Sequence, residues 1–396
     1  QPLDAVYLQI LKNLCTDLSE PVPLDGVDPS ALYRLAEKHC SLPFLLPYFE
    51  QQPQFSALKQ QTKQMLLSYY QLEHFTRLTF SLLLAEKIPC FLLKGISLAA
   101  NYPIPEYRKL GDLDLYIPEK DAFPVPAGFL TLMANGEPEE SDHHVTYRFT
   151  FPETGRSFTL ELHYRIVGIY QFSRANELVD EIFSASHLKP SFVELYGQTY
   201  PVLPPTENVF YMLHHMLKHY LYSGFGSRLL CDFTLYLERY ASEVNFEKIH
   251  FWCRESKIFH LYELILESAV FYFGLSASID PQVHCSASDC AIFLEKILAD
   301  GDFGSDTQRK IVSSGSYQHT GIHAWFHEGH IQMKLRFPKL HKCVLLWPVL
   351  WVITFFCFLS NTYRIRHTTL RQTLADFRAD NRKTKLLKIF DNNDLQ

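Results

Sequence analysis

The sequence predicts an α+β fold, in which a mixed sheet with flanking helices is followed by an all-helical C-terminal domain. Apolar side chains recur at three- and four-residue steps before about residue 86 and after about residue 200, which is typical of amphipathic helices. Between these regions, short apolar or alternating runs bounded by Gly and Pro are typical of strands. A chain of 396 residues that is 47% hydrophobic and 20% charged can form two or three folded domains.

The first half of the chain alternates between helical and strand-like segments. A long helix is expected from about residue 54 to 86, and the apolar run Pro89–Leu93 after it has the length of a strand. A helix is expected over Ile96–Asn101. Residues 119–126 contain two prolines and are expected to be irregular, and a short helix is expected to end at Asn135-Gly136.

Two later segments alternate between apolar and polar side chains. They span residues 143–151 and 156–166, and residues 152–155 between them predict the turn of a hairpin. The polar face of the second segment carries Glu161 and His163, two residues apart. These two side chains are therefore expected to point the same way from the sheet.

The second half of the chain is predicted to be helical. Helices are expected to begin at residue 205 and to cover residues 228–240, 246–252, 260–273 and 287–298. The predicted organisation has four parts: an N-terminal helical segment (1–60), a sheet-containing domain (61–195), a helical domain (196–342), and an apolar aromatic helix with a basic tail (343–396).

Charge and cysteine content narrow the class of protein. A net charge of −6 argues against general nucleic-acid binding by the chain as a whole. The nine cysteines are scattered without a CxxC pair, which predicts reduced thiols in a cytosolic protein. No basic region followed by an apolar one is visible at the start, so no signal peptide is expected.

Two carboxylates lie on one predicted strand, within Gly111-Asp112-Leu113-Asp114-Leu115. Residues two apart on a strand point the same way, so Asp112 and Asp114 share a face. Adjacent carboxylates repel unless a cation lies between them, and oxygen ligands suit a hard ion such as Mg²⁺. A solvated strand edge is the alternative. Glu161 would supply a third carboxylate from a later strand.

The segment before this strand is suited to an anion. Gly95 at a strand-to-helix turn would let a phosphate approach backbone N–H groups at a helix start. Lys94 and Ser97 would add a charge and a hydroxyl there. Arg108 would pair with a phosphate or hold Asp112 in place. Lys94 and Arg108 can also be ordinary surface cations.

These motifs carry a resemblance to a known family. Leu-Lys-Gly ends at Gly95, Arg-x-x-Gly-Asp-Leu-Asp-Leu runs from Arg108 to Leu115, and Glu-Leu-His spans 161–163. The chain here resembles the superfamily that includes DNA polymerase β and, more closely, the uncharacterised nucleotidyltransferase family of bacteria. The helical segment from Pro205 through His219 to Asp232 is also similar to that family, and the resemblance covers most of residues 60–350.

The resemblance implies that residues 61–195 form a nucleotidyltransferase-like catalytic domain. It implies metal-binding roles for Asp112, Asp114 and Glu161, and phosphate contacts near Gly95. Mg²⁺ or Mn²⁺ would be the cofactor. From its residue type and position, His163 is interpreted as a hydrogen-bond partner of the ligands and not as a metal ligand or a nucleophile. The superfamily's usual Gly-Ser pair is absent, because isoleucine follows the glycine here.

The implied activity is transfer of a nucleoside monophosphate from a nucleoside triphosphate to an acceptor, with release of pyrophosphate. The acceptor would be a small molecule, a sugar or a protein, and a nucleic acid is disfavoured because no basic groove is visible. The rival interpretations are a nucleotide-binding or regulatory module of the same fold without turnover, and a peripheral membrane scaffold. The protein is expected to be bacterial and to lie in the cytoplasm.

Two groups of histidines invite a metal hypothesis. His214, His215 and His219 lie on one predicted helix, where a nucleotide-facing or interior role is favoured over zinc binding. His219 and Asp232 are counted among the nucleotide-binding candidates, although Asp232 can equally form an ion pair with Arg228, four residues earlier. The second group, at positions 319, 323, 327 and 330, is interpreted as surface histidines.

The run from Cys343 to Ser360 is uncharged and aromatic, and a basic stretch follows it. Its eighteen residues are at the threshold for a membrane span. Burial of this helix against the helical domain is the favoured interpretation. Peripheral contact of residues 343–390 with anionic lipid is the alternative.

Overall fold

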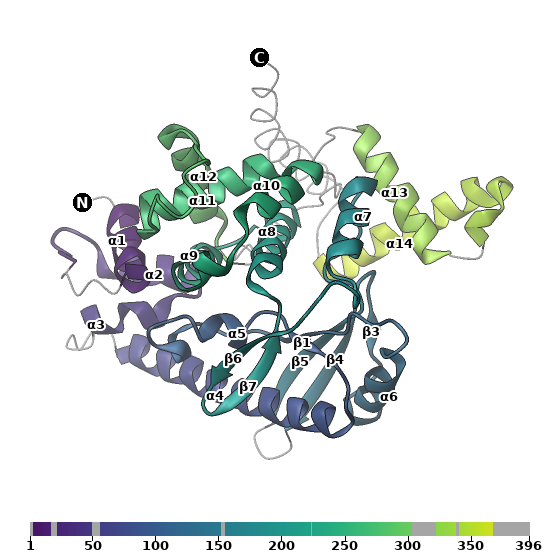
Figure 1. Ribbon diagram of the computed structural model, residues 1–396, viewed down its shortest axis with the longest axis horizontal. Helices are drawn as coiled ribbons and strands as arrows, with labels where there is room; N and C mark the ends of the chain where they lie inside the picture. Colours follow the sequence, from purple (N-terminus) through teal and green to yellow (C-terminus); the bar gives the residue numbers. More distant parts are fainter. Residues whose placement is uncertain are drawn as a thin grey trace.

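The fold is organised around a seven-stranded mixed sheet, which lies in the lower half of Figure 1. The computed structural model describes residues 3–16, 22–49, 56–151, 155–222, 224–302, 322–337 and 340–366. The strand order is β3-β4-β5-β2-β1-β7-β6. The strands are β1 (Phe91–Leu92), β2 (Leu113–Tyr116), β3 (Glu139–Glu140), β4 (His144–Phe151), β5 (Arg156–His163), β6 (Ser191–Leu195) and β7 (Gln198–Val202).

The sheet is mixed because its central strands run both ways. β2 pairs parallel with β5 and antiparallel with β1, while β1 pairs parallel with β7. β4 and β5 form the expected antiparallel hairpin, although residues 152–154 of its predicted turn lie outside the described residues. A parallel neighbour needs a crossover, and between β2 and β5 the chain passes through α6 (Pro124–Met133) and the β3–β4 pair.

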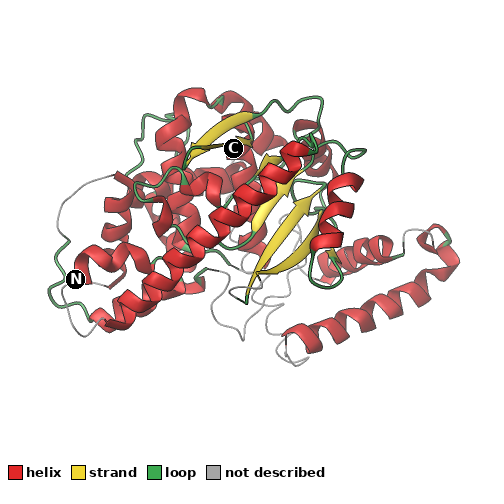
Figure 2. Cartoon of the chain, turned by 90° about the horizontal axis from the view of Figure 1, so that it is seen from below, coloured by secondary structure: helices red, strands yellow, loops and turns green. Residues whose placement is uncertain are grey.

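One face of the sheet is covered by the long helix α4 (Ser56–Ala85), which crosses the strands in Figure 2. Leu115, Leu160 and Leu162 from the sheet are buried in one core with aromatic side chains of this helix. Phe75 of α4 stacks on Phe158 of β5, with 5.6 Å between the ring centroids. Because alternate residues of β2 and β5 are buried here, the polar residues between them are turned to the opposite face.

The opposite face meets the helical half of the molecule (Figure 1). The helices on this side, several of them from the start of the chain, are α1 (Leu3–Thr16), α2 (Pro29–Lys38), α5 (Ile96–Ala99), α7 (Ser173–Ile182), α8 (Pro205–Tyr222), α9 (Ser227–Tyr240), α10 (Phe246–Glu255), α11 (Phe259–Phe273) and α12 (Ala287–Asp300), with the single turn α3 (Leu46–Phe49) nearby. The mixed sheet, its flanking helices and the helical C-terminal region are therefore confirmed.

The N-terminal helices share a core with the helical half. Tyr7 of α1 is fully buried, and its hydroxyl lies 2.8 Å from Ser227 Oγ at the start of α9 and 2.7 Å from Ser41 Oγ. Residues of α1, α2, α9 and α11 belong to one apolar cluster. The described helices of the expected 1–60 segment are thus part of the helical region in space. The order of the elements along the sequence does not predict this contact.

Two local expectations are wrong. Residues 119–126 are not irregular throughout, because α6 begins at Pro124. Proline is tolerated in the first turn of a helix, where its missing N–H costs nothing. The helix expected over 96–101 is a single turn, α5, that ends at Ala99.

The C-terminal described region is a helical hairpin of α13 (Ile322–Arg336) and α14 (Trp347–Arg366). Trp347 and Trp351 of α14 contact His330 of α13, but Val349 and Phe356 are 57% and 63% exposed. The expectation that this helix is buried against the helical domain is therefore wrong for much of its surface. Among the described residues, no helix is long and apolar enough to cross a membrane. The basic stretch after residue 366 lies outside the described residues.

Candidate active site

The site begins where β1 ends. Leu93 N donates to Asp114 O at 3.1 Å, so the chain stays beside β2 until it turns at Gly95. Gly95 has φ +73°, a backbone conformation that L side chains rarely adopt, and its carbonyl begins the single turn of α5. This turn points Lys94 back over the carboxylate strand.

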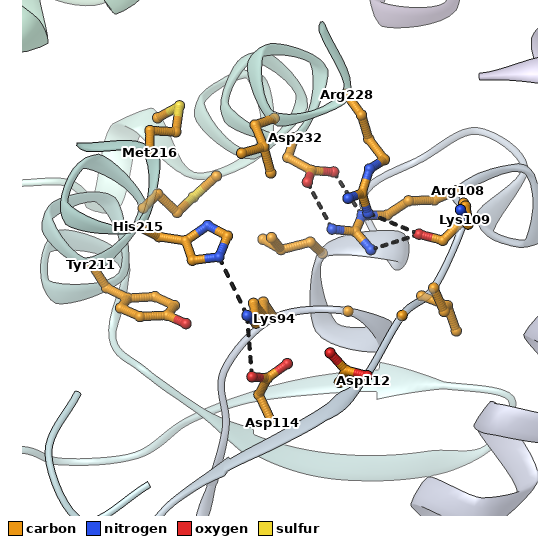
Figure 3. Close-up of a pocket in the computed structure, with 16 residues that line it drawn as sticks. Lys94, Arg108, Lys109, Asp112, Asp114, Tyr211, His215, Met216, Arg228 and Asp232 are labelled. Atoms are coloured by element: carbon orange, nitrogen blue, oxygen red, sulfur yellow. Dashed lines mark hydrogen bonds and ion pairs between the residues drawn. The ribbon is translucent and has the colours of Figure 1, made fainter. Parts of the chain in front are cut away.

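Three carboxylates come together on the polar face of the sheet. Asp114 of β2 lies directly opposite Glu161 of β5 in a parallel register. Asp112 precedes β2 and lies on the same side as Asp114 in Figure 3. Asp114 is 1% exposed, and its Oδ2 has no hydrogen-bond partner among the described residues. The sequence could not fix this register, because it depends on how two strands far apart in the chain align.

The ionisation of these acids reflects their crowding. Burial, followed by the charges of Asp114 and Glu161, raises the pKa of Asp112 to about 6. Burial would also raise the pKa of Glu161, but the hydrogen bond from His163 and the charge of Lys94 outweigh it and lower that pKa. The site thus accumulates negative charge that a cation would relieve.

His163 lies between two of the acids. Its Nε2 is 3.3 Å from Asp114 Oδ1 and 3.4 Å from Glu161 Oε2. Burial alone would lower the pKa of His163, but hydrogen bonds to the two carboxylates raise it. The side chain therefore lies where the sequence placed it, against the ligands of the expected metal.

Lys94 is the cation nearest to Asp114. Its Nζ lies 3.2 Å from Asp114 Oδ1 and 3.3 Å from His215 Nε2, as the dashed lines in Figure 3 show. Burial would lower the pKa of Lys94, but the charge of Asp114 outweighs it and raises the pKa. Lys94 is thus a charged side chain inside the site and is not an ordinary surface cation.

Helix α8 supplies the opposite wall of the site. His215 and His219 lie one turn apart, and their Nε2 atoms are 3.1 Å from each other. Burial and the nearby charge of Lys94 hold the pKa of both imidazoles well below the usual range, so both are neutral at pH 7. His214 points elsewhere, with its Nδ1 2.8 Å from the Tyr170 hydroxyl in the core.

Arg108 joins the sheet-containing half to the helical half. Its Nε and Nη2 donate to the two oxygens of Asp232 on α9, both at 2.7 Å, and the Tyr102 hydroxyl donates to the same carboxylate at 2.8 Å. Arg108 and Asp232 are 3% and 1% exposed. The side chains of this pair bind each other, so the structure assigns them to holding the carboxylate segment in place.

Arg228 also belongs to this framework, although the sequence offered it only as an ion-pair partner of Asp232. Its side chain lies 2.9 Å from Asp302 Oδ2, and its Nη1 donates to Lys109 O at 3.0 Å. The carbonyl of Lys109 is thereby fixed three residues before Asp112. The spacing of Arg228 and Asp232 suggested an ion pair within one helix, but Asp232 is held by Arg108, which lies 124 positions away.

Ser97 does not join this group. Its hydroxyl donates to Leu93 O at 3.0 Å, and its side chain lines a separate cavity beside β6 and β7. The expectation of a Ser97 hydroxyl at a phosphate is therefore wrong in this conformation, because the single-turn helix α5 carries the residue away from the acids.

One pocket collects most of the remaining candidates (Figure 3). Lys94, Gly95, Arg108, Asp112, Asp114, Asp232 and the α8 residues Tyr211 and His215 line it. Glu161 and His163 adjoin it through Asp114, and His219 adjoins it through His215. A pocket with acids at the sheet and the cation Lys94 beside them is suited to a ligand that carries phosphates and a metal ion.

This fold and site define an α+β protein with an acidic centre on a mixed sheet. Residues 25–274 match the model of the family described as uncharacterised nucleotidyltransferase, which is more than half of the chain. The chain therefore belongs to this nucleotidyltransferase family, and its membership suggests an enzyme that transfers a nucleotide.

Two further comparisons add little. No match is found among curated proteins. Among solved structures, the chain is similar to an antigenic nucleotidyltransferase-like protein from Paracoccidioides brasiliensis, with 15% identity and a TM-score of 0.33. The alignment covers 52% of this chain and 93% of that one.

Proposed function

We propose that the protein is a metal-dependent nucleotidyltransferase that moves a nucleoside monophosphate from a nucleoside triphosphate to an acceptor and releases pyrophosphate. The observation that carries this proposal is the parallel register that sets Glu161 beside Asp114, on the face that also holds Asp112. Family membership supports the same reaction class. The acceptor is proposed to be a small molecule, a sugar or a protein.

The donor set fits a hard divalent cation. Asp112, Asp114 and Glu161 offer carboxylate oxygens, and Asp114 Oδ2 is buried without a hydrogen-bond partner among the described residues. We propose that these three side chains hold Mg²⁺ or Mn²⁺. An ion held there would supply positive charge to offset the negative charge that develops at the α-phosphorus.

The other side chains would position the nucleotide. Lys94, held between Asp114 and His215, presents a charge to a phosphate oxygen, and the turn at Gly95 lets the backbone approach it. The ion pair of Arg108 and Asp232 fixes the loop that leads into β2. The positions of Asp112 and Asp114 would therefore be held while the nucleotide reacts. His163 would orient Asp114 and Glu161.

The test is label transfer from a nucleoside triphosphate. Purified protein is incubated with labelled nucleotides, Mg²⁺ or Mn²⁺ and a cell extract that supplies acceptors. Asp112→Asn and Asp114→Asn should lower transfer at least ~100-fold, because each removes a metal ligand worth several kcal/mol in the transition state. Asp121→Asn, a change at an exposed acid outside the site, is the matched control and should leave transfer unchanged.

Nucleotide binding without transfer under either metal would contradict the proposed enzyme and favour the regulatory module.

A cytoplasmic setting is also proposed, and the free state of all nine cysteines supports it. The bacterial origin and the kinship with the DNA polymerase β superfamily remain predictions of the sequence motifs. Liposome flotation with and without residues 343–396 would test the proposed peripheral membrane contact.

A further inference from the structure

A cluster of three histidines lies beside the carboxylates, and the proposed function does not use it as a ligand set. His144 begins β4, where it pairs with His163 at the end of β5, and His143 precedes it. The three side chains are 5%, 9% and 3% exposed in chain order. Each can offer one ring nitrogen, and these three nitrogens lie within 4.8 Å of one another.

Neighbouring groups fix the orientation of two of these rings. Asp142 Oδ1 lies 2.6 Å from His143 Nδ1, and Asp142 is itself held by the backbone N–H of Ile169 at 2.9 Å. Ser141 Oγ lies 3.1 Å from His144 Nδ1. In both rings the Nδ1 has a partner, so Nε2 is the nitrogen available to an ion; in His144 this atom lies 3.6 Å from Glu161 Oε1. A carboxylate that orients an imidazole in this way is typical of metal-binding histidines.

Two further observations point to a ligand. His163 Nδ1 and Asp114 Oδ2 are buried polar atoms without a hydrogen-bond partner among the described residues. A cation also already meets the cluster, since Lys218 Nζ on α8 lies 3.2 Å from His143 Nε2. The cluster thus already holds one positive charge against a ring nitrogen.

We propose that His143, His144 and His163 bind a divalent transition-metal ion of the zinc class, at a second site next to the oxygen-rich one. Imidazole nitrogen suits Zn²⁺ and Co²⁺, whereas Mg²⁺ prefers oxygen. Three protein nitrogens leave one coordination position of a tetrahedral ion open. That position can take water or an anionic oxygen.

Lys218 opposes the ion with its own charge. Its removal should therefore tighten metal binding, which is the opposite of what the loss of a structural side chain would do.

The experiment uses the full chain, stripped of metal with a chelator, and needs no nucleotide. Co²⁺ is titrated in, the visible absorption of nitrogen-ligated cobalt is followed, and Zn²⁺ is then used to displace it. The wild type should bind one equivalent at this site. His144→Ala and His143→Ala should weaken binding at least ~100-fold, and Asp142→Asn ~10-fold, because ligands and their hydrogen-bond partners both set affinity.

Three controls keep the test decisive. His187→Ala removes an exposed histidine outside the cluster and should leave Co²⁺ binding unchanged. Asp112→Asn should abolish nucleotide transfer but keep the cobalt spectrum, which separates this site from the proposed activity. Lys218→Met should tighten binding at least ~10-fold, since it removes one nearby positive charge.

Folding of each variant is checked by circular dichroism, and His144→Gln replaces His144→Ala if the smaller side chain prevents folding. The proposal is overturned if the wild type binds no Co²⁺ or Zn²⁺, or if the His143 and His144 variants bind it as tightly as the wild type does. It is also overturned if Lys218→Met weakens binding, because the lysine would then be supporting the site.

Discussion

At the scale of single residues, the buried ion pair of Arg108 and Asp232 defines how the site is held. Both side chains are almost fully excluded from solvent, and two parallel hydrogen bonds of 2.7 Å join them. A buried charge is tolerated only while its partner is present. The sequence offered each residue either as a nucleotide contact or as a structural partner of a residue nearby in the chain, but it contains no signal for a pairing across 124 positions.

Asp232→Asn should lower the free energy of unfolding by ~3–5 kcal/mol, because it leaves the guanidinium buried without a counter-charge. Denaturant unfolding followed by fluorescence measures the change. Arg174→Ala is the control, since it breaks an ion pair with Glu255 that is about 40% exposed on both sides and should alter stability little. Equal, small effects of the two changes would show that solvent reaches Arg108.

At the scale of elements, the turn between β1 and α5 decides where Lys94 points. Gly95 has φ +73°, and a Cβ built there would lie 3.5 Å from Asp112 O, which is ordinary contact. The requirement for glycine is therefore conformational, since the space would accept a methyl group. The motif Leu-Lys-Gly is explained by this turn together with the ion pair between Lys94 and Asp114.

Gly95→Ala should lower the free energy of unfolding by ~1–3 kcal/mol, because an L side chain is strained at this φ. It should also weaken nucleotide binding, since relief of the strain moves Lys94. Gly111→Ala provides a matched control. Gly111 has no positive φ, and a Cβ added there would meet no atom within 4 Å, so stability should change little. If both variants melt at the same temperature, the turn is not strained.

Elements also show what the sequence could predict. Period-two alternation correctly placed the polar residues of β2 and β5 on one face, because that rule is local to each strand. The register of Asp114 with Glu161 is non-local and needed the sheet itself. The His143-His144 pair was missed as a site, although adjacent histidines at the start of a hairpin strand, opposite another histidine, were the available signal.

At the scale of the whole molecule, buried neutral histidines connect distant segments. His39, at the end of α2, accepts from Ser227 N at 3.1 Å, and its Nε2 lies 3.3 Å from Leu298 O. His39 thereby links the end of α2, the start of α9 and the last turn of α12. Its imidazole must stay neutral to accept the hydrogen bond from Ser227 N. Burial lowers its pKa to about 4, and lowers the pKa of His214 to about 3.

This arrangement predicts that stability falls as the pH is lowered from about 6.5 to 4. In that window the unfolded chain binds protons at these histidines and the folded chain does not, so the free energy of unfolding rises with pH. Each such histidine contributes a slope of at most ~1.4 kcal/mol per pH unit. Urea unfolding at a series of pH values between 4 and 7 measures the slope.

His39→Gln separates this effect from general acid sensitivity. Gln does not titrate, so the variant should lose up to ~1.4 kcal/mol per pH unit of slope between pH 4 and 6.5, whatever its stability at pH 7. His187→Gln, at an exposed position, should keep the wild-type slope. An unchanged slope in His39→Gln would mean that His39 takes up a proton in the folded protein. The hydrogen bond from Ser227 would then have to break without unfolding the junction of the three helices.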